Sequence, residues 1–374
     1  MSKEKIEFLY LSEPDMIEAG VLDMKECIRV MEDVFSLMSD NDYLLGGPKG
    51  SSHGMKLWYP KEKRGKNMPV AGTDRRAMTM IAYVGGEYDV CGNKWYGSNV
   101  SNKEKGLPRS IHSITLNDPQ TGAPLAMCSG NLVSAMRTGA VPGIATKYLK
   151  SESASIVGII GAGVINRAAL IAICEVLENV DNVKIYNRTK LKAEALCKEL
   201  SKETGIKMTV VDSLEEAVRG SDVISIATSG AKSAKIEDDW VKQGAIIHLV
   251  GTASLSEELY INSTVVVDNW NMHLDWIDEG LRHSDGIDSL ILSAPSAPLM
   301  KLYLEKKKSQ SEIINLGDII TQRSVGRRNN EETVIFISGG IPAEDVAWAY
   351  TVYNRALEMG IGQKLLLWEK PHWS

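Results

Sequence analysis

The spacing of apolar residues changes along the chain and predicts two kinds of architecture. Near the start, apolar residues recur at helical intervals over 28–38. Between 46 and 130 the pattern is that of short strands separated by polar, glycine-rich stretches, and a helix over 132–149 follows with an interruption at Pro142. The strands predicted here are 78–84, 93–98 and a hairpin within 112–129 that turns at 118–122.

From residue 154 the pattern alternates between strands and helices. Near-continuous Val and Ile runs are separated by helical stretches, which is typical of a parallel sheet covered by helices on both faces. The predicted strands are 155–161, 183–187, 208–211, 222–228, 244–251 and 263–269, and the helices between them are 163–177, 190–200 and 213–220. After about residue 320 the pattern becomes mixed again, with a strand-like 332–340 and a helix over 343–360.

A glycine turn joins the first strand of this alternating region to its helix. Gly161 and Gly163 match the first two positions of G-x-G-x-x-G, and the third position holds Asn166. At the start of a parallel strand–helix–strand unit, the first glycine allows a tight turn and the second lets the backbone approach a pyrophosphate at the helix N-terminus. The small residues Ala168 and Ala169 offset the bulk of Asn166 on that helix face. The sequence therefore predicts a Rossmann dinucleotide-binding domain, and the alternative is the same fold with an empty turn.

The residues after the second strand bear on the choice of nucleotide. An NAD site commonly has an acidic residue there for the ribose 2′-hydroxyl, whereas this chain has Asn187, Arg188, Thr189 and Lys190. A guanidinium and a hydroxyl suit a 2′-phosphate, so NADP(H) is favoured and NAD(H) is the alternative. Arg188 could instead belong to an ordinary surface loop.

Composition and charge narrow the class of protein. The 374 residues allow two domains, since single cores stop growing at roughly 250–300 residues. A net charge of −6 gives no reason to expect a nucleic-acid or membrane partner. The five cysteines are widely spaced and include no C-x-x-C pair, which argues against a disulfide framework and a structural zinc site. With no signal-peptide core and no long apolar run, we expect a reduced, cytoplasmic protein.

The histidines offer weaker signals. The six histidines show no metal-ligand spacing, so no metal site is predicted. His112 lies on a predicted strand and either faces a pocket as a proton relay or is a neutral structural side chain. His248 lies inside a buried strand and is predicted to be structural.

Several longer motifs lie along the chain. They are "CGNKWYGSN" (91–99), "GLPRSIHSITLNDPQTGAPLAM" (106–127), "SAMRTGAVPGIATKYL" (134–149), "GAGVINRAA" (161–169) and "IPAEDVAWAYTVYNRALEMGIG" (341–362). Together they resemble the ornithine cyclodeaminase/μ-crystallin family of NAD(P)-dependent enzymes. The resemblance covers nearly the whole chain, and its "LNDP.TG.P.A…S..RT.A" pattern is far more specific than a glycine turn alone.

This resemblance implies a particular domain organisation. The fold is α/β, with a Rossmann doubly wound parallel sheet inserted into a second, α+β domain for substrate binding and dimerisation. The substrate domain is expected at 1–130 plus 325–374, and the dinucleotide-binding domain at 131–324. A homodimer formed through the substrate domain is implied.

The resemblance also implies roles for individual residues. Lys94 matches the lysine that holds the substrate carboxylate and assists proton transfer, and Arg137 matches the arginine between the substrate and the cofactor phosphates. Lys49 and Arg109 are further candidates for binding the substrate, and Ser338 lies near the nicotinamide. The expected cofactor-binding residues are Arg137, Gly161, Gly163, Val164, Ile165, Asn187, Arg188, Thr189, Lys190, Thr228, Val250 and Ser338.

One departure from the family pattern affects the reaction. Cyclodeaminases proper have an aspartate after the fifth strand, where this sequence places Ala253 or Ser254, although Glu257 or Glu258 could substitute from a shifted turn. The leading hypothesis is therefore an NAD(P)(H)-dependent amino-acid dehydrogenase or ketimine reductase, with hydride transfer at the α-carbon of an amino acid or its imine. The alternatives are an ornithine-cyclodeaminase-type ammonia lyase that uses NAD catalytically, and an NADPH-dependent small-ligand binding protein like μ-crystallin.

Overall fold

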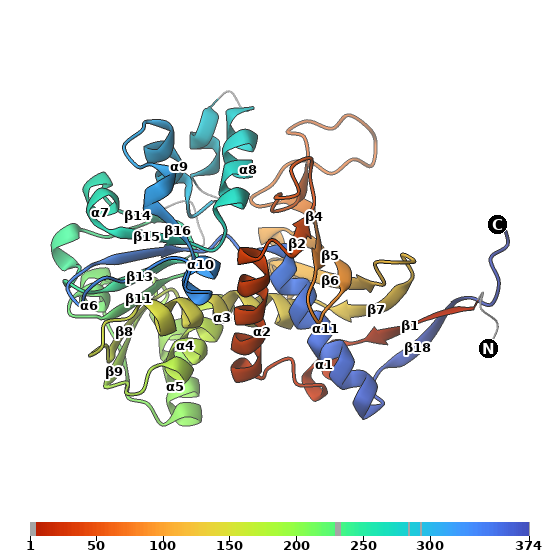
Figure 1. Cartoon of the computed structure of the whole chain (residues 1–374), viewed down its shortest axis with the longest axis horizontal. Coiled ribbons are helices and arrows are strands. Elements are labelled where there is room, and N and C mark those ends of the chain that lie inside the picture. Colours follow the sequence, from red (N-terminus) through yellow and green to blue (C-terminus); the bar gives the residue numbers. More distant parts are fainter. Residues whose placement is uncertain (1–4, 229–232, 283–284, 292–293, 374) are drawn as a thin grey trace. The chain divides into compact units, whose positions relative to one another are not determined.

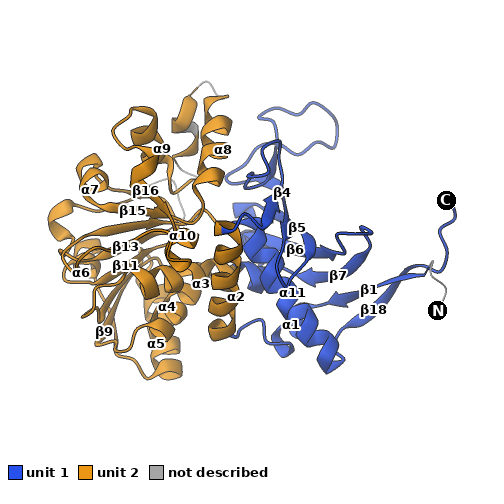
Figure 2. Ribbon diagram, viewed as in Figure 1, with its two compact units in different colours: residues 1–23, 40–134, 341–374 blue, residues 24–39, 135–340 orange. Residues whose placement is uncertain are grey.

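The structure is a computed structural model that describes residues 5–228, 233–282, 285–291 and 294–373. The chain divides into two compact units (Figure 2). Unit 1 comprises residues 1–23, 40–134 and 341–374, and unit 2 comprises residues 24–39 and 135–340.

Unit 1 contains an eight-stranded sheet in the order β18-β1-β7-β6-β5-β4-β2, with β3 also paired to β4 (Figure 1). Its strands are β1 (Ile6–Leu11), β2 (Tyr43–Leu45), β3 (Met55–Trp58), β4 (Arg76–Val84), β5 (Val90–Ser98), β6 (Ser110–Asn117), β7 (Pro124–Ser129) and β18 (Gln363–Trp368). Its helices are α1 (Glu13–Glu18), η1 (Val100–Lys105) and α11 (Pro342–Met359). Only β1 and β7 pair in parallel among the strand pairs described in this sheet.

The two faces of the central strands in unit 1 have opposite character. Successive side chains of a strand point to opposite faces, and on β5 Lys94 is buried whereas Trp95 is 49% exposed. Helix α11 packs on the face that carries Lys94, so closely that a Cβ on Gly92 would lie 2.7 Å from Val346. The helix ends at Gly360, whose φ of 68° provides the left-handed C-cap, as the sequence predicts.

Unit 2 contains a parallel sheet in the order β10-β9-β8-β11-β13-β17-β15-β16, flanked by helices (Figure 1). Its strands are β8 (Ile156–Ile160), β9 (Asn182–Tyr186), β10 (Met208–Val210), β11 (Val223–Ile226), β13 (Ile246–Leu249), β15 (Thr264–Val267), β16 (Ile313–Asn315) and β17 (Val334–Ile337). A separate pair is formed by β12 (Ala234–Lys235) and β14 (Ala253–Ser254). The strand order reverses at β8, as in the doubly wound fold that the sequence predicts.

The helices of unit 2 connect these strands. They are α2 (Met24–Ser39), α4 (Val164–Val176), α5 (Lys190–Thr204), α6 (Leu214–Val218), η2 (Asp238–Trp240), α7 (Glu257–Asn262), α8 (Trp270–Leu281), η3 (Gly286–Leu290), α9 (Ala297–Leu304), η4 (Gln310–Glu312) and α10 (Leu316–Ile320). Helix α3 (Asn131–Leu149) begins in unit 1 and continues in unit 2.

The predicted interruption of the 132–149 helix is wrong, because α3 runs unbroken through Pro142. A proline in a helix removes a backbone hydrogen bond and is costly in an isolated helix. Here the helix is buried along most of its length, and Gly143 lets α4 approach until an added Cβ would lie 2.7 Å from Ala172. Tertiary packing therefore outweighs the local effect of the proline.

The expected domains differ from the two observed units at the boundary near residue 325 and in the placement of α2. The boundary near 130 is close to the observed break after Ser134, but the expected boundary at 324–325 is replaced by one at 340–341. The reason is β17, which lies between β13 and β15 with all four of its residues buried. Helix α2 also belongs to unit 2, where it packs on α4 and α10 and Ser39 Oγ donates a 2.7 Å hydrogen bond to Asp318.

A buried histidine in unit 2, His248 on β13, is hydrogen-bonded to Thr146 on α3. Thr146 Oγ1 donates to the Pro142 carbonyl at 2.8 Å, so it accepts from His248 Nε2, also at 2.8 Å. Burial lowers the pKa of His248 to about 3, so this side chain is neutral and structural, as its place in a buried strand predicts.

We predict that His248 makes the fold sensitive to acid. In the unfolded chain this histidine has an ordinary pKa near ~6.5 and binds a proton below that pH, whereas in the folded chain it stays neutral. The free energy of unfolding therefore falls as the pH decreases below ~6.5. Between pH 7 and pH 5 this side chain should lower the free energy of unfolding by about 2 kcal/mol. In urea denaturation, the unmodified protein and the exposed variant His372→Gln should both lose this stability between pH 7 and pH 5, whereas His248→Gln should not. Equal acid sensitivity of all three proteins would contradict the prediction.

Candidate functional site

The glycine turn after β8 has the geometry that a pyrophosphate needs. Gly161 has a φ of +102°, and an added Cβ would lie 2.6 Å from the Ala227 carbonyl oxygen. Gly163 is the N-cap of α4, with no side-chain cap and no atom within 4 Å of an added Cβ. The first N–H groups of α4, which include those of Val164 and Ile165, therefore have no side-chain cap beside an open N-cap position, and a helix N-terminus of this kind favours an anion.

Asn166 occupies the place of the third glycine and points inward. Its Nδ2 donates to the carbonyl oxygens of Ile160 at 2.8 Å and Gly161 at 2.7 Å, and its Oδ1 accepts from Ser225 Oγ at 2.8 Å. The side chain is completely buried. The amide thus ties the turn to the ends of β8 and β11. These hydrogen bonds offset the bulk of Asn166, in addition to the small side chains of Ala168 and Ala169 that the sequence suggested.

The other expected cofactor residues of unit 2 lie at the same edge of the sheet. Asn187, Thr228 and Ser338 each follow a parallel strand, and Val250 follows β13. Asn187 Oδ1 accepts from the Ala162 N–H at 3.1 Å, which joins the end of β9 to the glycine turn. Ligands of open α/β sheets bind at this carboxyl edge, where the strand order reverses.

The three residues after Asn187 are all exposed. Lys190 forms an ion pair with Asp212 at 2.6 Å, and Asn187 Nδ2 donates to the Thr189 carbonyl at 2.9 Å. Arg188 and Thr189 thus lie exposed between β9 and α5, directly after the second strand of the unit.

Arg137 and Ser338 are buried at a second place on this edge. An added Cβ on Gly340, whose φ is +79°, would lie 2.5 Å from Arg137 Nη1, so the guanidinium lies directly against the turn that follows β17. Ser338 is 2% exposed, and its Oγ has no hydrogen-bond partner among the described residues. A buried hydroxyl of this kind is suited to a ligand group.

In unit 1, Lys94 is 1% exposed and lies against a carboxylate. Its Nζ donates to Asp345 Oδ2 at 2.6 Å and to Ser134 Oγ at 3.3 Å. Both side chains of the ion pair are buried, at 2% and 0% exposure. The Lys94 amine and the Asp345 carboxylate are thus paired with each other inside unit 1.

A second polar cluster lies farther along the strands of unit 1. Asp74 forms ion pairs with Arg76 and, at 3.2 Å, with Arg109. Arg109 also donates to the Tyr96 hydroxyl at 3.3 Å, and the Tyr96 ring stacks on His112 with centroids 4.5 Å apart. Arg109 is thus part of an ion-pair network, and His112 belongs to the same sheet face as Lys94 because Ile114 pairs with Lys94.

Two other sequence candidates contribute less to a site. Lys49 lies exposed in the loop between β2 and β3. Ala253 and Ser254 form β14, so the place of the cyclodeaminase aspartate carries no carboxylate. Glu257 on α7, one of the two acids that could substitute for this aspartate, forms an ion pair with Lys307 at 2.8 Å.

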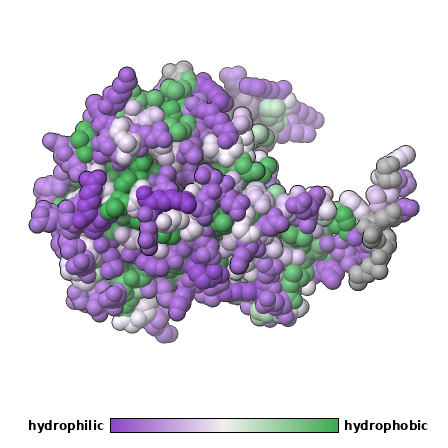
Figure 3. All heavy atoms as spheres, viewed as in Figure 1, coloured by the Kyte–Doolittle hydropathy of each residue, from purple (hydrophilic) through white to green (hydrophobic). Residues whose placement is uncertain are grey.

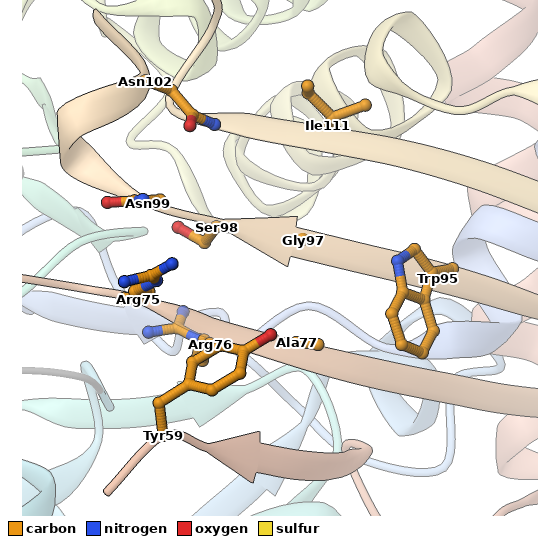
Figure 4. A pocket seen from close by; sticks show the side chains of 10 residues that line it. All are labelled: Tyr59, Arg75, Arg76, Ala77, Trp95, Gly97, Ser98, Asn99, Asn102 and Ile111. Atoms are coloured by element: carbon orange, nitrogen blue, oxygen red, sulfur yellow. The ribbon is translucent and has the colours of Figure 1, made fainter. Parts of the chain in front are cut away.

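A cavity of about 270 Å³ opens in unit 1 where β4 begins and β5 ends (Figure 4). Trp95, Gly97 and Ile111 belong to the face opposite Lys94, and Figure 4 shows Trp95 at one end with Arg75 and Arg76 toward the other. Lys94 does not line the cavity, so the site built around Lys94 is separate from it.

Metal binding, membrane insertion and thiol chemistry find little support in the described part of the chain. No group of three or more His, Cys, Asp or Glu side chains there is placed to hold a metal ion. No helix within the described ranges has the length and apolarity to cross a membrane, and the face in Figure 3 is mostly hydrophilic. Burial raises the pKa of the Cys128 and Cys174 thiols to about 12, so neither is a ready nucleophile.

The parallel sheet, its glycine turn and the second antiparallel domain define an α/β protein of the Rossmann type. The model of the ornithine cyclodeaminase/mu-crystallin family matches residues 21–360. The chain therefore belongs to this family.

Three relatives illustrate the range of the family. The chain is 26% identical over 366 residues to N-((2S)-2-amino-2-carboxyethyl)-L-glutamate dehydrogenase of Staphylococcus aureus, covering 97% of this chain and 99% of that protein. It is 30% identical to Thermococcus litoralis Delta(1)-pyrroline-2-carboxylate reductase in complex with NADH and L-proline, with a TM-score of 0.76 over 95% of this chain and 99% of that one. An archaeal alanine dehydrogenase dimer with bound NAD is 25% identical, with a TM-score of 0.78 over 97% and 100% of the two chains.

We predict strong energetic coupling between Lys94 and Asp345. Removing one partner of a buried ion pair leaves an uncompensated charge and costs about 3–5 kcal/mol. Lys94→Met and Asp345→Asn should each lower the free energy of unfolding by that amount, and the double variant by much less than their sum. The half-exposed pair of Lys147 and Glu32, at 2.7 Å, is the matched control and should couple by no more than about 1 kcal/mol. Additive losses at Lys94 and Asp345 in urea denaturation would show that the pair is not coupled.

Proposed function

We propose that this protein is an NAD(P)(H)-dependent oxidoreductase that transfers a hydride at the α-carbon of an amino acid or its imine. The observation that carries the proposal is the uncapped N-terminus of α4 behind Gly161 and Gly163, at the point where the strand order reverses. The three relatives described above are dehydrogenases or a reductase of amino acids and cyclic imino acids, and two of them contain a nicotinamide nucleotide.

The residues of unit 2 fit a nicotinamide dinucleotide. The open N–H groups of α4 suit the pyrophosphate, and the unpartnered Ser338 hydroxyl offers a hydrogen bond to a bound group. When bound, the nicotinamide supplies the hydride acceptor or donor. In the oxidative direction an amino acid and NAD(P)⁺ give an imino acid, NAD(P)H and a proton.

The residues of unit 1 fit the substrate side of this reaction. We assign Lys94 to the substrate carboxylate and, in the reductive direction, to donating a proton to the nitrogen of the imine, with Asp345 holding the Lys94 ammonium in place. From unit 2, Arg137 is assigned to the substrate and the cofactor phosphates as a fixed positive charge, which orients both. Arg109 is a further candidate for a second anionic group of the substrate, and Lys49, exposed in its loop, is the least supported of the expected contacts.

The ammonia lyase is the second candidate function. Its family pattern requires a carboxylate for the side-chain amine of a diamino acid, and β14 supplies Ala253 and Ser254 instead. A cationic side chain would therefore lack a counter-charge there, which favours the dehydrogenase or reductase. The binding-protein alternative predicts bound nucleotide without turnover.

One assay separates these functions. Purified protein is mixed with L- and D-amino acids, or with cyclic imines, and with NAD and NADP separately, while reduced nucleotide and ammonia are followed. Net change of the nucleotide, abolished in Lys94→Ala, is the expected result. Ammonia release from a diamino acid without net change would establish the lyase. Nucleotide binding with neither signal would contradict the proposed reaction for these substrates.

We also infer that NADP(H) is the preferred nucleotide. Arg188 and Thr189 are exposed after β9, where an acidic residue would otherwise hold a ribose 2′-hydroxyl. A guanidinium pairs with a 2′-phosphate through charge-assisted hydrogen bonds.

Arg188→Ala should weaken NADP⁺ binding and spare NAD⁺. Loss of a hydrogen bond to a charged group corresponds to about 10- to 100-fold in Kd, whereas NAD⁺ has no phosphate at that position. Titration calorimetry measures both constants, and Lys192→Ala, at an exposed position in the first turn of α5, is the control. Equal weakening of the two nucleotides, or tighter NAD⁺ binding by the unmodified protein, would overturn the preference.

We propose a homodimer formed through the open face of the sheet in unit 1. Exposed apolar side chains gather on the face opposite Lys94; they are Ile81, Trp95, Ile111 and Met127, each 39–52% exposed. An apolar sheet face of this kind is suited to burial against a partner, and the similar archaeal alanine dehydrogenase is a dimer.

We also place the protein in the cytoplasm, in keeping with its odd number of widely spaced cysteines.

Trp95→Glu should convert the dimer to a monomer, because it places a charge in the centre of an apolar interface. Light scattering should give twice the chain mass of 41.0 kDa for the unmodified protein and a single chain mass for the variant. Leu191→Glu, at a more exposed apolar position of unit 2, should leave the dimer intact. A monomeric unmodified protein would refute the proposal.

A further inference from the structure

A buried carboxylate in unit 2 joins two segments far apart in sequence. Asp268, directly after β15, is 1% exposed. Its Oδ1 accepts from His273 Nε2 at 2.7 Å and from the Asn269 N–H at 2.8 Å. Its Oδ2 accepts the N–H groups of Gly339 at 2.6 Å and Gly340 at 3.1 Å. One side chain therefore ties the start of α8 to the turn after β17.

The histidine that bonds Asp268 is itself fixed. His273 is completely buried, and its Nδ1 lies 2.8 Å from Ser296 Oγ, which is also completely buried. The rings of Trp270 and Trp276 flank the imidazole with centroids 5.9 and 5.4 Å away. With both nitrogens bonded and both sides packed, the imidazole has one orientation, and it donates toward Asp268.

The turn that Asp268 holds has almost no space to move. A Cβ on Gly339 would lie 2.6 Å from the Trp276 ring and 2.7 Å from Met272 Cε. A Cβ on Gly340 would lie 2.5 Å from Arg137 Nη1. The turn is thus wedged between α8 and the Arg137 guanidinium, and a shift of its backbone would displace both neighbours.

We propose that Asp268, held by His273 and Ser296, is a positioning residue that sets the Ser338–Gly340 turn and, through Gly340, the place of Arg137. This inference rests on the proposed function, in which Ser338 and Arg137 face the cofactor and substrate. A displacement of about 1 Å near reacting groups costs up to about 10²-fold in rate. Asp268, His273 and Ser296 would therefore affect turnover without contacting the substrate or the cofactor.

The test compares variants that keep or remove donation to Asp268. In His273→Gln the amide Nε2 can still donate to Asp268, whereas His273→Ala removes the donor, and Asp268→Asn removes the charge that accepts from both glycine amides. Thr146→Val, at a buried hydroxyl of the same unit bonded to His248, is the matched control. Each protein is assayed well below its own unfolding temperature for kcat, KM and the Kd of the oxidised nucleotide.

The expected result is a split between kcat and binding. Asp268→Asn and His273→Ala should lose about 10- to 100-fold in kcat, and the nucleotide Kd should rise by a smaller factor, since Arg137 is displaced while the glycine turn at α4 is untouched. His273→Gln should recover a large part of that kcat, and Thr146→Val should lose stability without a comparable loss of kcat. Equal kcat for His273→Gln and His273→Ala, or losses that only follow thermal stability, would overturn the positioning role.

A structural readout keeps this inference separate from the proposed function. If the unmodified protein turns over no amino acid or imine, the proposed function fails, and crystal structures of the unmodified and Asp268→Asn proteins with oxidised nucleotide then decide the positioning role. A displaced Ser338–Gly340 turn with a displaced Arg137 supports it. An unchanged turn overturns it.

Discussion

A charge in a protein interior must be paired, and the pairing fixes where both partners stand. This constraint organises each unit of the chain. In unit 1, the buried carboxylate of Asp345 is neutralised by Lys94, which joins α11 to β5. In unit 2, the buried carboxylate of Asp268 is held by His273 and by two glycine amides, which joins α8 to the turn after β17. Leaving any of these groups alone in the interior would cost several kcal/mol, so the elements that carry them cannot drift apart while the units stay folded.

The sequence patterns predict most of the fold because much of it is local. The continuous Val and Ile runs of β8, β11, β13 and β15 and the helical stretch before Gly360 are each determined by residues close together in the chain. The misassigned pieces are those decided by distant partners. The apolar run of β17 looks the same whether it joins the parallel sheet or a second domain, and only its insertion between β13 and β15 settles this. The continuity of α3 through Pro142 likewise depends on packing against α4.

The same distinction applies to the candidate site. The glycine turn could be located because strand, turn and helix are consecutive, and Lys94 because a long motif surrounds it. Asp345 lies 251 positions from Lys94, and Asp268 lies more than 70 positions from the glycines it holds. No spacing rule connects residues so far apart, so neither acid stood out in the sequence. A usable signal was present, however: Glu344 and Asp345 lie in the first turn of α11 among apolar residues, and acidic side chains are costly to bury without a partner.

Asn166 shows why a departure from a motif need not remove its function. The third glycine of the fingerprint allows helix and strand to pack closely, and a bulkier residue would be expected to push α4 away from β8. Instead the amide is turned into the gap and donates to the carbonyl oxygens of Ile160 and Gly161 at the end of the strand. A glycine would leave those carbonyls to find other partners. The substituted position therefore stabilises the turn from inside, while the N–H groups of α4 that face outward stay open to an anion.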